Sequence, residues 1–272
     1  MLEEVIALNS KEIIVKWYNK LGFPKHYDEE FYSALERYEI DKSLTLDKYD
    51  LNCEDGKKNL LYFLYFCEET EKIYKEKGIS EDVLTDTLAD ISRWLDIWSE
   101  LKGELYLGEL DWLSYHLKAK LFKLGRLQFC FADSYEFKER GIKKGDTVID
   151  THIPSAGPLL IDECEKSFDF AREFFAKFYP EYKWEVFTCH SWLLGEDLKE
   201  ILDENSNIIK FQKLFTIDSQ YESDSVLSYT IKWKIKRDEL PLVDAKSSFA
   251  KKVKEKALNG GVFHGGSGYI NR

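Results

Sequence analysis

An aspartate and a histidine lie two positions apart in DTVIDTHIP (146–154), a stretch whose alternating residue types predict a β-strand. Side chains two positions apart on a strand point to the same face, so Asp150 and His152 should be neighbours. A carboxylate beside an imidazole can orient the ring and stabilise its charged form. We therefore treat Asp150 and His152 as a candidate catalytic pair.

The turn Pro154-Ser155-Ala156-Gly157-Pro158 follows this strand and precedes an apolar-periodic stretch. Ligands of open α/β sheets bind at the carboxyl edge of the strands, and N–H groups at a helix start can hold an anion such as a pyrophosphate. The plainer interpretation is a rigid turn, because prolines fix φ and glycine allows a positive φ. Both interpretations stay open at this point.

A second group of reactive residues lies in TCHSW (188–192). Cys189 and His190 are adjacent on a predicted strand, so they face opposite sides and cannot pair with each other. Cys189 could instead meet His152, and His190 could meet a carboxylate. A nucleophilic cysteine needs a lowered pKa, whereas a cysteine in an aromatic-rich strand is more often a small buried hydrophobe.

The C-terminal tail NGGVFHGGSGYI surrounds His264 with glycines and follows four lysines, Lys251, Lys252, Lys254 and Lys256. Such a loop could cradle a phosphate. More often a glycine-rich end is mobile and a row of lysines is a solvated helix face. No group of His, Cys, Asp and Glu has the spacing of metal ligands, so we predict no metal site.

The elements that must position these residues change in kind near residue 123. Residues 1–122 have the apolar period of helices. In the second half apolar and polar residues alternate in several segments, and the predicted order of elements is β-β-α-β-α-β-β. The sequence thus predicts an α+β protein with a helical N-terminal domain over 1–122 and an α/β domain over 123–272. Predicted helices cover 3–22, 29–40, 55–78, 80–103, 108–122, 159–180, 196–213 and 247–258; predicted strands cover 124–137, 146–154 and 184–194, with a hairpin formed by 215–221 and 225–235.

Composition narrows the classes of partner. The formal net charge of −11 argues against a nucleic-acid partner. The longest apolar run, LLYFLYFC (60–67), is far below the roughly 20 residues of a membrane-spanning helix. The start carries acids where a signal peptide needs basic residues, and five scattered cysteines without a CxxC pair indicate reduced thiols. We predict a cytoplasmic protein without a membrane partner.

Several sequence blocks together resemble a bacterial family of acyltransferase-domain proteins. The blocks are WLSYHLKAKLFKLGRLQF (112–129), THIPSAGPLLIDECEKSFDFAREFF (151–175), VFTCHSWLL (186–194) and NSNIIKFQKLF (205–215). The resemblance implies a helical N-terminal domain followed by a mixed-sheet domain similar to GNAT N-acyltransferases. In that superfamily two parallel strands diverge around the pantetheine arm of acyl-CoA, and the resemblance assigns these strands to 146–154 and 184–194.

The same resemblance implies an activity and roles for residues. The co-substrate would be acetyl-CoA or another acyl-CoA, and the acceptor a small-molecule or peptide amine. Ser155, Ala156 and Gly157 would lie at the pyrophosphate and Asn207 along the cofactor. His152 would be the general base, oriented by Asp150, with Cys189 as a further catalytic candidate.

Two departures from the GNAT pattern favour an alternative. PSAGPL keeps one glycine of the phosphate loop and follows it with a proline, which removes an N–H donor. Phe211 stands where the superfamily often has a tyrosine that protonates the leaving thiolate. The alternative is a non-catalytic binding protein with a GNAT-like fold. A third possibility is a hydrolase that uses Cys189 as its nucleophile.

Overall fold

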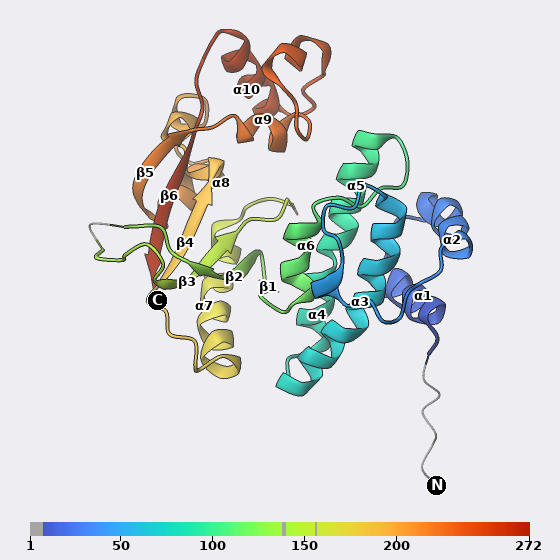
Figure 1. Ribbon diagram of the computed structural model, residues 1–272. Coiled ribbons are helices and arrows are strands. Elements are labelled where there is room, and N and C mark those ends of the chain that lie inside the picture. The colour runs from blue at the N-terminus through green and yellow to red at the C-terminus, as the bar shows by residue number, and fades with distance from the viewer. Residues whose placement is uncertain (1–7, 138–139, 156) are drawn as a thin grey trace. The chain divides into compact units, whose positions relative to one another are not determined.

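The computed structural model describes residues 8–137, 140–155 and 157–272. The chain divides into two compact units, with the boundary between Lys123 and Leu124 (Figure 1). The predicted fold class is confirmed, because the first unit is helical and the second is built on a mixed β-sheet.

The helical unit is organised around its longest helix, α3 (Gly56–Lys77), which contacts α1, α2, α4 and α6. The run 60–67 lies in α3 and is largely buried, so it is a core segment. No helix in the described ranges combines the length and apolarity needed to cross a membrane. The other helices of this unit are α1 (Ser10–Leu21), α2 (Asp28–Arg37), α4 (Glu81–Leu88), α5 (Asp90–Lys102) and α6 (Leu110–Leu117).

Some predicted helix boundaries in this unit were wrong. The helix predicted over 80–103 is two helices, which meet at Ala89. The helix predicted over 108–122 ends at Leu117, and strand β1 (Leu121–Leu124) follows after Ala119, whose φ of 49° cannot continue a helix. Part of the helix predicted over 3–22 lies in residues 1–7, outside the described ranges.

The sheet has the strand order β1-β2-β3-β4-β6-β5, and its strands β2 to β6 belong to the second unit. Strands β3 and β4 are parallel, whereas the β2–β3, β4–β6 and β5–β6 pairs are antiparallel. Among these four pairs, β3–β4 is the parallel one, and it joins the two strands that the family resemblance assigned to the acyl-CoA site. The strands beyond β1 are β2 (Leu127–Asp133), β3 (Thr147–His152), β4 (Val186–Ser191), β5 (Thr216–Glu222) and β6 (His264–Asn271).

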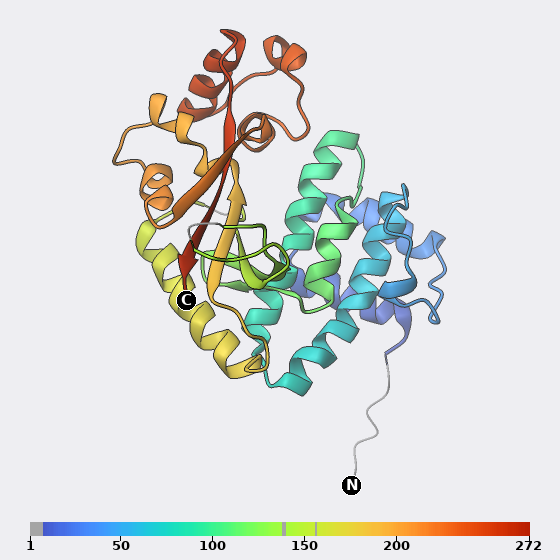
Figure 2. The same ribbon diagram turned by 60° about the vertical axis from the view of Figure 1, so that its left-hand side comes forward.

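Helix α7 (Ile161–Phe178) connects β3 to β4 and lies along one face of the sheet (Figure 2). Its buried residues Cys164, Phe168, Ala171 and Phe175 follow the three- and four-residue spacing of one helix face. Phe168 packs on Phe187 of β4, with ring centroids 5.0 Å apart. This packing buries one face of β3 and β4. Their other face carries Val148 and Val186 in a small apolar cluster, followed along the strands by Asp150 and Thr188.

The predicted hairpin over 215–221 and 225–235 was wrong. β5 pairs with β6, which is formed by the glycine-rich tail and lies between β4 and β5. A Cβ atom on Gly266 would lie 2.6 Å from the backbone oxygen of Leu194, so this position needs glycine. The tail is therefore an internal strand, and the phosphate cradle considered for it is not formed.

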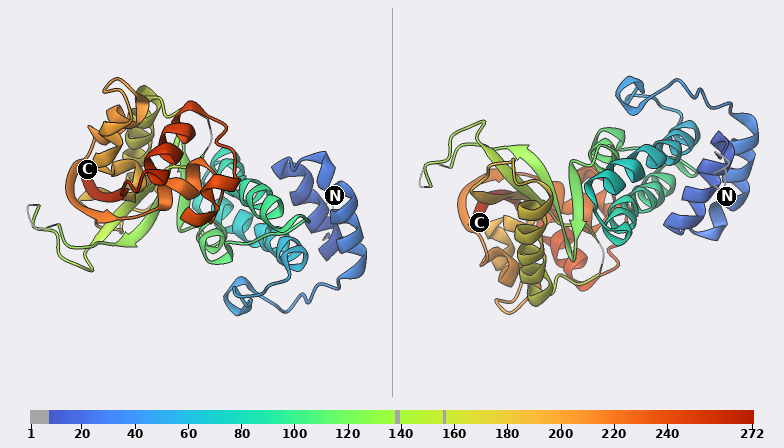
Figure 3. Two further views of the ribbon diagram at one scale, coloured as in Figure 1. Left: turned by 90° about the horizontal axis from the view of Figure 1, so that it is seen from above. Right: turned by 90° about the horizontal axis from the view of Figure 1, so that it is seen from below.

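Residues 225–235 begin with the helix α9 (Ser225–Thr230) instead of a strand. Val226 and Leu227 are adjacent in sequence and both buried, which a strand with one buried face would not allow. They enter an apolar cluster with Val253 of α10 (Ser248–Leu258), and the two helices pack together (Figure 3). The helix predicted over 196–213 is likewise two segments, a 3-10 turn at Glu196–Glu200 and α8 (Asn207–Gln212).

Candidate active site

The parallel pairing of β3 and β4 is short. Its register joins Ile149 with Phe187 and Asp150 with Thr188. β3 continues to His152 and β4 to Ser191, and their outer edges stay paired to β2 and β6 as far as these residues. The pairing between β3 and β4 therefore ends at Asp150 and Thr188, before the carboxyl ends of the two strands at His152 and Ser191.

Two imidazoles lie just beyond this point, one on each strand. His152 of β3 and His190 of β4 are two positions past the last register pair and share its face. His152 Nε2 lies 3.2 Å from Asp150 Oδ2, and the Thr188 hydroxyl donates a hydrogen bond of 2.6 Å to Asp150 Oδ1. The structure thus brings Asp150 and His152 together, as their spacing predicted.

The largely buried Asp150 carboxylate is held in its charged form. Burial by itself would raise the pKa of this carboxyl group. The charge and hydrogen bond of His152, the hydrogen bond from Thr188 and the charge of His190 outweigh burial and lower it. Asp150 is thus an anion that can stabilise positive charge on either imidazole.

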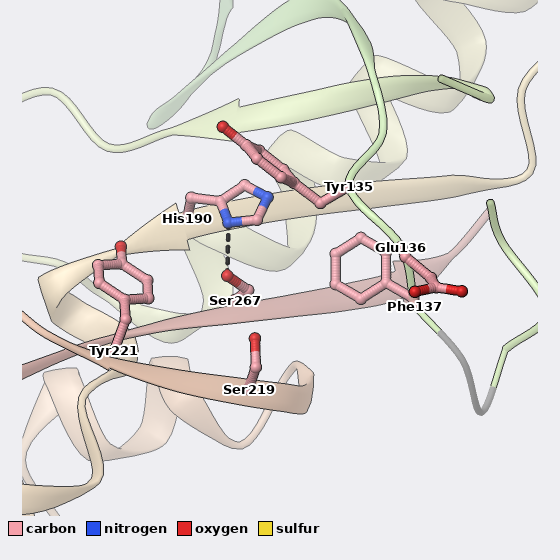
Figure 4. A pocket seen from close by; sticks show the side chains of 7 residues that line it. All are labelled: Tyr135, Glu136, Phe137, His190, Ser219, Tyr221 and Ser267. Carbon is pink, nitrogen blue, oxygen red and sulfur yellow. Dashed lines mark hydrogen bonds between the residues drawn. The ribbon is translucent and has the colours of Figure 1, made fainter. Parts of the chain in front are cut away.

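His190 lines a pocket of about 460 Å³ (Figure 4). In the sheet it lies in one row with Ser267 of β6 and Ser219 of β5. Its Nδ1 atom is 2.5 Å from the Ser267 hydroxyl oxygen. The pocket is completed by Tyr135, Glu136 and Phe137, which follow β2, and by Tyr221 of β5.

The His190 imidazole is neutral at pH 7. Burial lowers its pKa below the usual value near 6.5; Asp150 raises it in part, and His152 lowers it further. A neutral imidazole can accept a proton, and the bond between Nδ1 and Ser267 fixes the ring orientation. The partner of His190 could not be assigned from the sequence, since its neighbours in space come from strands distant in sequence.

The turn after β3 is held by an arginine that the sequence analysis did not single out. The Arg126 guanidinium donates to the carbonyl oxygens of Pro154, Gly157 and Pro158, at 2.9, 3.2 and 3.0 Å. Ser155 and Gly157 are exposed in this turn, and Gly157 has a φ of 70°. Ala156 lies outside the described residues.

The start of α7 follows this turn, and its N-cap residue, Leu160, makes no side-chain capping bond. Asp162 and Glu163 in the first turn already interact favourably with the helix dipole. Arg126 adds a positive charge at the turn through its guanidinium group.

Cys189 does not meet His152 in the structure. It lies on the opposite face of β4 from His190 and is fully buried. Burial raises the pKa of its thiol well above 9.0, so the reactive thiolate is disfavoured. These observations favour the interpretation of Cys189 as a small buried hydrophobic residue over its interpretation as a nucleophile.

This burial predicts how the cysteines react. Iodoacetamide should label the partly exposed Cys53 in the folded protein and leave Cys189 unlabelled until the protein is unfolded. Peptide mass spectrometry after timed labelling measures both rates. Equal rates for Cys189 and Cys53 would revive the hydrolase hypothesis.

Two other residues from the sequence analysis lie elsewhere in the second unit. Asn207 is the first residue of α8 and is half-buried; within the described ranges, no hydrogen bond joins it to the 154–158 turn. Phe211 of the same helix is fully buried and packs on Phe215. The described residues contain no group of three or more His, Cys, Asp and Glu side chains that could hold a metal ion.

Comparisons with known proteins identify both halves of the chain. A model described as an N-acyltransferase N-terminal domain matches residues 14–119, and one described as a GNAT-like C-terminal domain matches residues 121–270. No curated protein matched the chain.

Similar solved structures include three structures of acyltransferases. One, in complex with decanoyl-CoA and teicoplanin, is 22% identical with a TM-score of 0.77, covering 100% of this chain and 91% of that chain. A variant in complex with octanoyl-CoA is 22% identical with a TM-score of 0.79, covering 99% and 90%. A third, in complex with decanoyl-CoA, is 22% identical with a TM-score of 0.75, covering 94% and 86%. At this identity the likeness establishes a shared fold.

Proposed function

The chain belongs to the family defined by a GNAT-like C-terminal domain, and on this premise we propose that it transfers an acyl group from an acyl-CoA thioester to an amine. The observation that carries the proposal is the end of the β3–β4 register at Asp150 and Thr188, with an imidazole beyond it on each strand. The similar acyltransferases hold decanoyl-CoA or octanoyl-CoA, so these are the first donors to test.

In this proposal the pantetheine arm lies between β3 and β4, beyond their last register pair. The pyrophosphate lies at the turn after β3, on Ser155, Ala156 and Gly157. Arg126 gives this turn its shape and positive charge through the three carbonyl oxygens that it binds. Asn207 is the proposed contact from α8.

The reaction requires one nucleophilic attack and one proton transfer. The amine nitrogen attacks the thioester carbonyl carbon, the C–N bond forms, the C–S bond breaks, and CoA leaves as a thiolate. The proton lost by the nitrogen passes to an imidazole and then to the thiolate. A backbone N–H on the β4 edge that faces β3 stabilises the oxyanion in between. Since the imidazole returns the proton, the absence of a hydroxyl at Phe211 does not block the reaction.

We assign the proton transfer to His190, because it lines the pocket and its lowered pKa keeps it neutral. Asp150 stabilises the imidazolium that forms on His190. Ser267 is a positioning residue that orients the ring. His152, the base predicted from the sequence, is the competing candidate, with Asp150 as its direct partner.

The test of the function is release of free CoA thiol from decanoyl-CoA, octanoyl-CoA and acetyl-CoA with a panel of amines. One similar acyltransferase is bound to teicoplanin, so a glycopeptide amine belongs in this panel. Thiol release that depends on the amine supports the proposal. Acyl-CoA binding without release from any pair supports the non-catalytic alternative, and no binding at millimolar acyl-CoA contradicts both.

The turn geometry predicts a specific role for Arg126. Arg126→Ala should weaken acyl-CoA binding about tenfold, the equivalent of ~1.4 kcal/mol, because hydrogen bonds from a charged donor are lost and the turn loosens. Arg126→Lys should lose less of the acyl-CoA affinity, since lysine keeps the positive charge. Calorimetric titration with CoA measures the affinity.

Arg237→Ala is the matched control for Arg126, because Arg237 also donates to a backbone carbonyl, that of Gly261. Its removal should leave CoA affinity unchanged. An equal loss of CoA affinity in both variants would show that Arg126→Ala acts by destabilising the protein, and it would contradict the role given to Arg126.

A further inference from the structure

The pocket that contains His190 has aromatic walls. Tyr135, Phe137 and Tyr221 line it, and the Tyr135 ring lies edge-on over the His190 ring, with centroids 4.3 Å apart (Figure 4). We propose that this pocket binds the acceptor as a primary ammonium attached to a skeleton with a flat, ring-sized apolar face. This inference rests on the proposed acyl transfer and specifies its acceptor.

The charge of the lining favours a cation. Glu136 is the acidic residue among the lining residues, and His190 is neutral because its pKa is lowered. The negative faces of aromatic rings attract an ammonium group, and a carboxylate at the same pocket adds to that attraction. An anionic acceptor would meet the Glu136 carboxylate without a compensating positive side chain from the pocket lining.

The exposure of the walls favours a flat apolar group on the acceptor. Tyr135 is 63% exposed and Tyr221 is 41% exposed, although both are large aromatic residues. The Tyr221 ring is held over Gly265, where a Cβ atom would collide with it. A ring carried by the acceptor would cover these two exposed faces, and aromatic contacts stabilise such stacking.

The position of His190 connects recognition to the reaction. In the tautomer whose Nδ1–H donates to the Ser267 hydroxyl oxygen, Nε2 is the nitrogen that receives a proton from the bound ammonium. The ammonium loses this proton to His190, which releases it to solvent, and the neutral amine attacks the thioester. The second proton passes from the nitrogen to the neutral His190 and from His190 to the CoA thiolate as the C–S bond breaks. A pocket of about 460 Å³ is within the usual size range of small-molecule sites.

The experiment is calorimetric titration of the full chain, with and without saturating CoA, using four probes. These are phenethylamine, its neutral counterpart 2-phenylethanol, the anion 3-phenylpropanoate, and butylamine, which lacks a ring. We expect phenethylamine to bind at least tenfold more tightly than each of the other three. Glu136→Gln and Tyr135→Ala should each weaken phenethylamine binding about 5-fold to 30-fold.

A control variant separates recognition from general destabilisation. Tyr229→Ala removes an exposed ring of α9 outside the pocket lining and should bind phenethylamine unchanged. The proposal is overturned if phenethylamine does not bind at millimolar concentration, if butylamine or the carboxylate binds as tightly, or if both pocket variants bind normally. Selective phenethylamine binding without thiol release from any acyl-CoA would leave the pocket assignment standing and remove the transferase function.

Discussion

Replacing His190 by alanine should lower the turnover number about 10²-fold to 10⁴-fold, the usual contribution of a general base. The reason is that His190 is the imidazole lining the pocket and is neutral at pH 7, because burial lowers its pKa. Acyl-CoA affinity should stay the same, since the 154–158 turn is not altered. Thiol release under saturating acyl-CoA measures the turnover number, and calorimetry measures the acyl-CoA affinity.

The parallel variant His152→Ala decides between the two imidazoles. If His190 is the base, His152→Ala should lose much less activity, because it removes only a partner of Asp150. If the large loss appears in His152→Ala and His190→Ala stays active, the base is the residue predicted from the sequence. His26→Ala, an exposed histidine of the helical unit, should behave like the wild type.

Asp150→Asn is expected to have the second largest effect, a loss of about 10² in turnover, because the imidazolium formed during proton transfer loses its buried anionic neighbour. Asparagine has nearly the same shape, so it removes charge with little change in volume. Asp150 raises the pKa of His190 in the wild type. Removing its charge should lower that pKa further, so the acidic decline of the turnover number moves to lower pH.

The pH profile distinguishes this electrostatic role from a structural one. A merely destabilised protein would lose active molecules without a shift in the acidic decline. Asp218→Asn is the matched control, because Asp218 is an exposed carboxylate on β5 of the same sheet. An unshifted profile in Asp150→Asn, or an equal shift in Asp218→Asn, would contradict the role given to Asp150.

The parts of the site that the sequence could predict are local in the chain. Asp150 and His152 are two residues apart on one strand, and the period of a strand alone brings them together. The change from helical to alternating periodicity also predicted the two-part architecture. Both features follow from the periodicity of residue types along neighbouring positions, so neither required knowledge of pairing between distant segments.

The missed parts depend on pairing between distant segments. β6 comes from a tail whose glycines carry no apolar period, and its place between β4 and β5 depends on pairing with strands distant in the sequence. His190 acquires Ser267 only through this strand. Arg126 reaches the turn after β3 from a position 28 residues before Pro154. None of these contacts leaves a pattern in the sequence near the residues involved.

The most direct test of the proposed acyl-CoA site is a crystal structure of the chain with decanoyl-CoA. The account predicts that the pantetheine arm lies between β3 and β4, next to the backbone at 151–152 and 189–191, with the thioester on the face that carries His190. CoA bound elsewhere on the chain, with β3 and β4 closed together by side chains beyond Asp150 and Thr188, would contradict it.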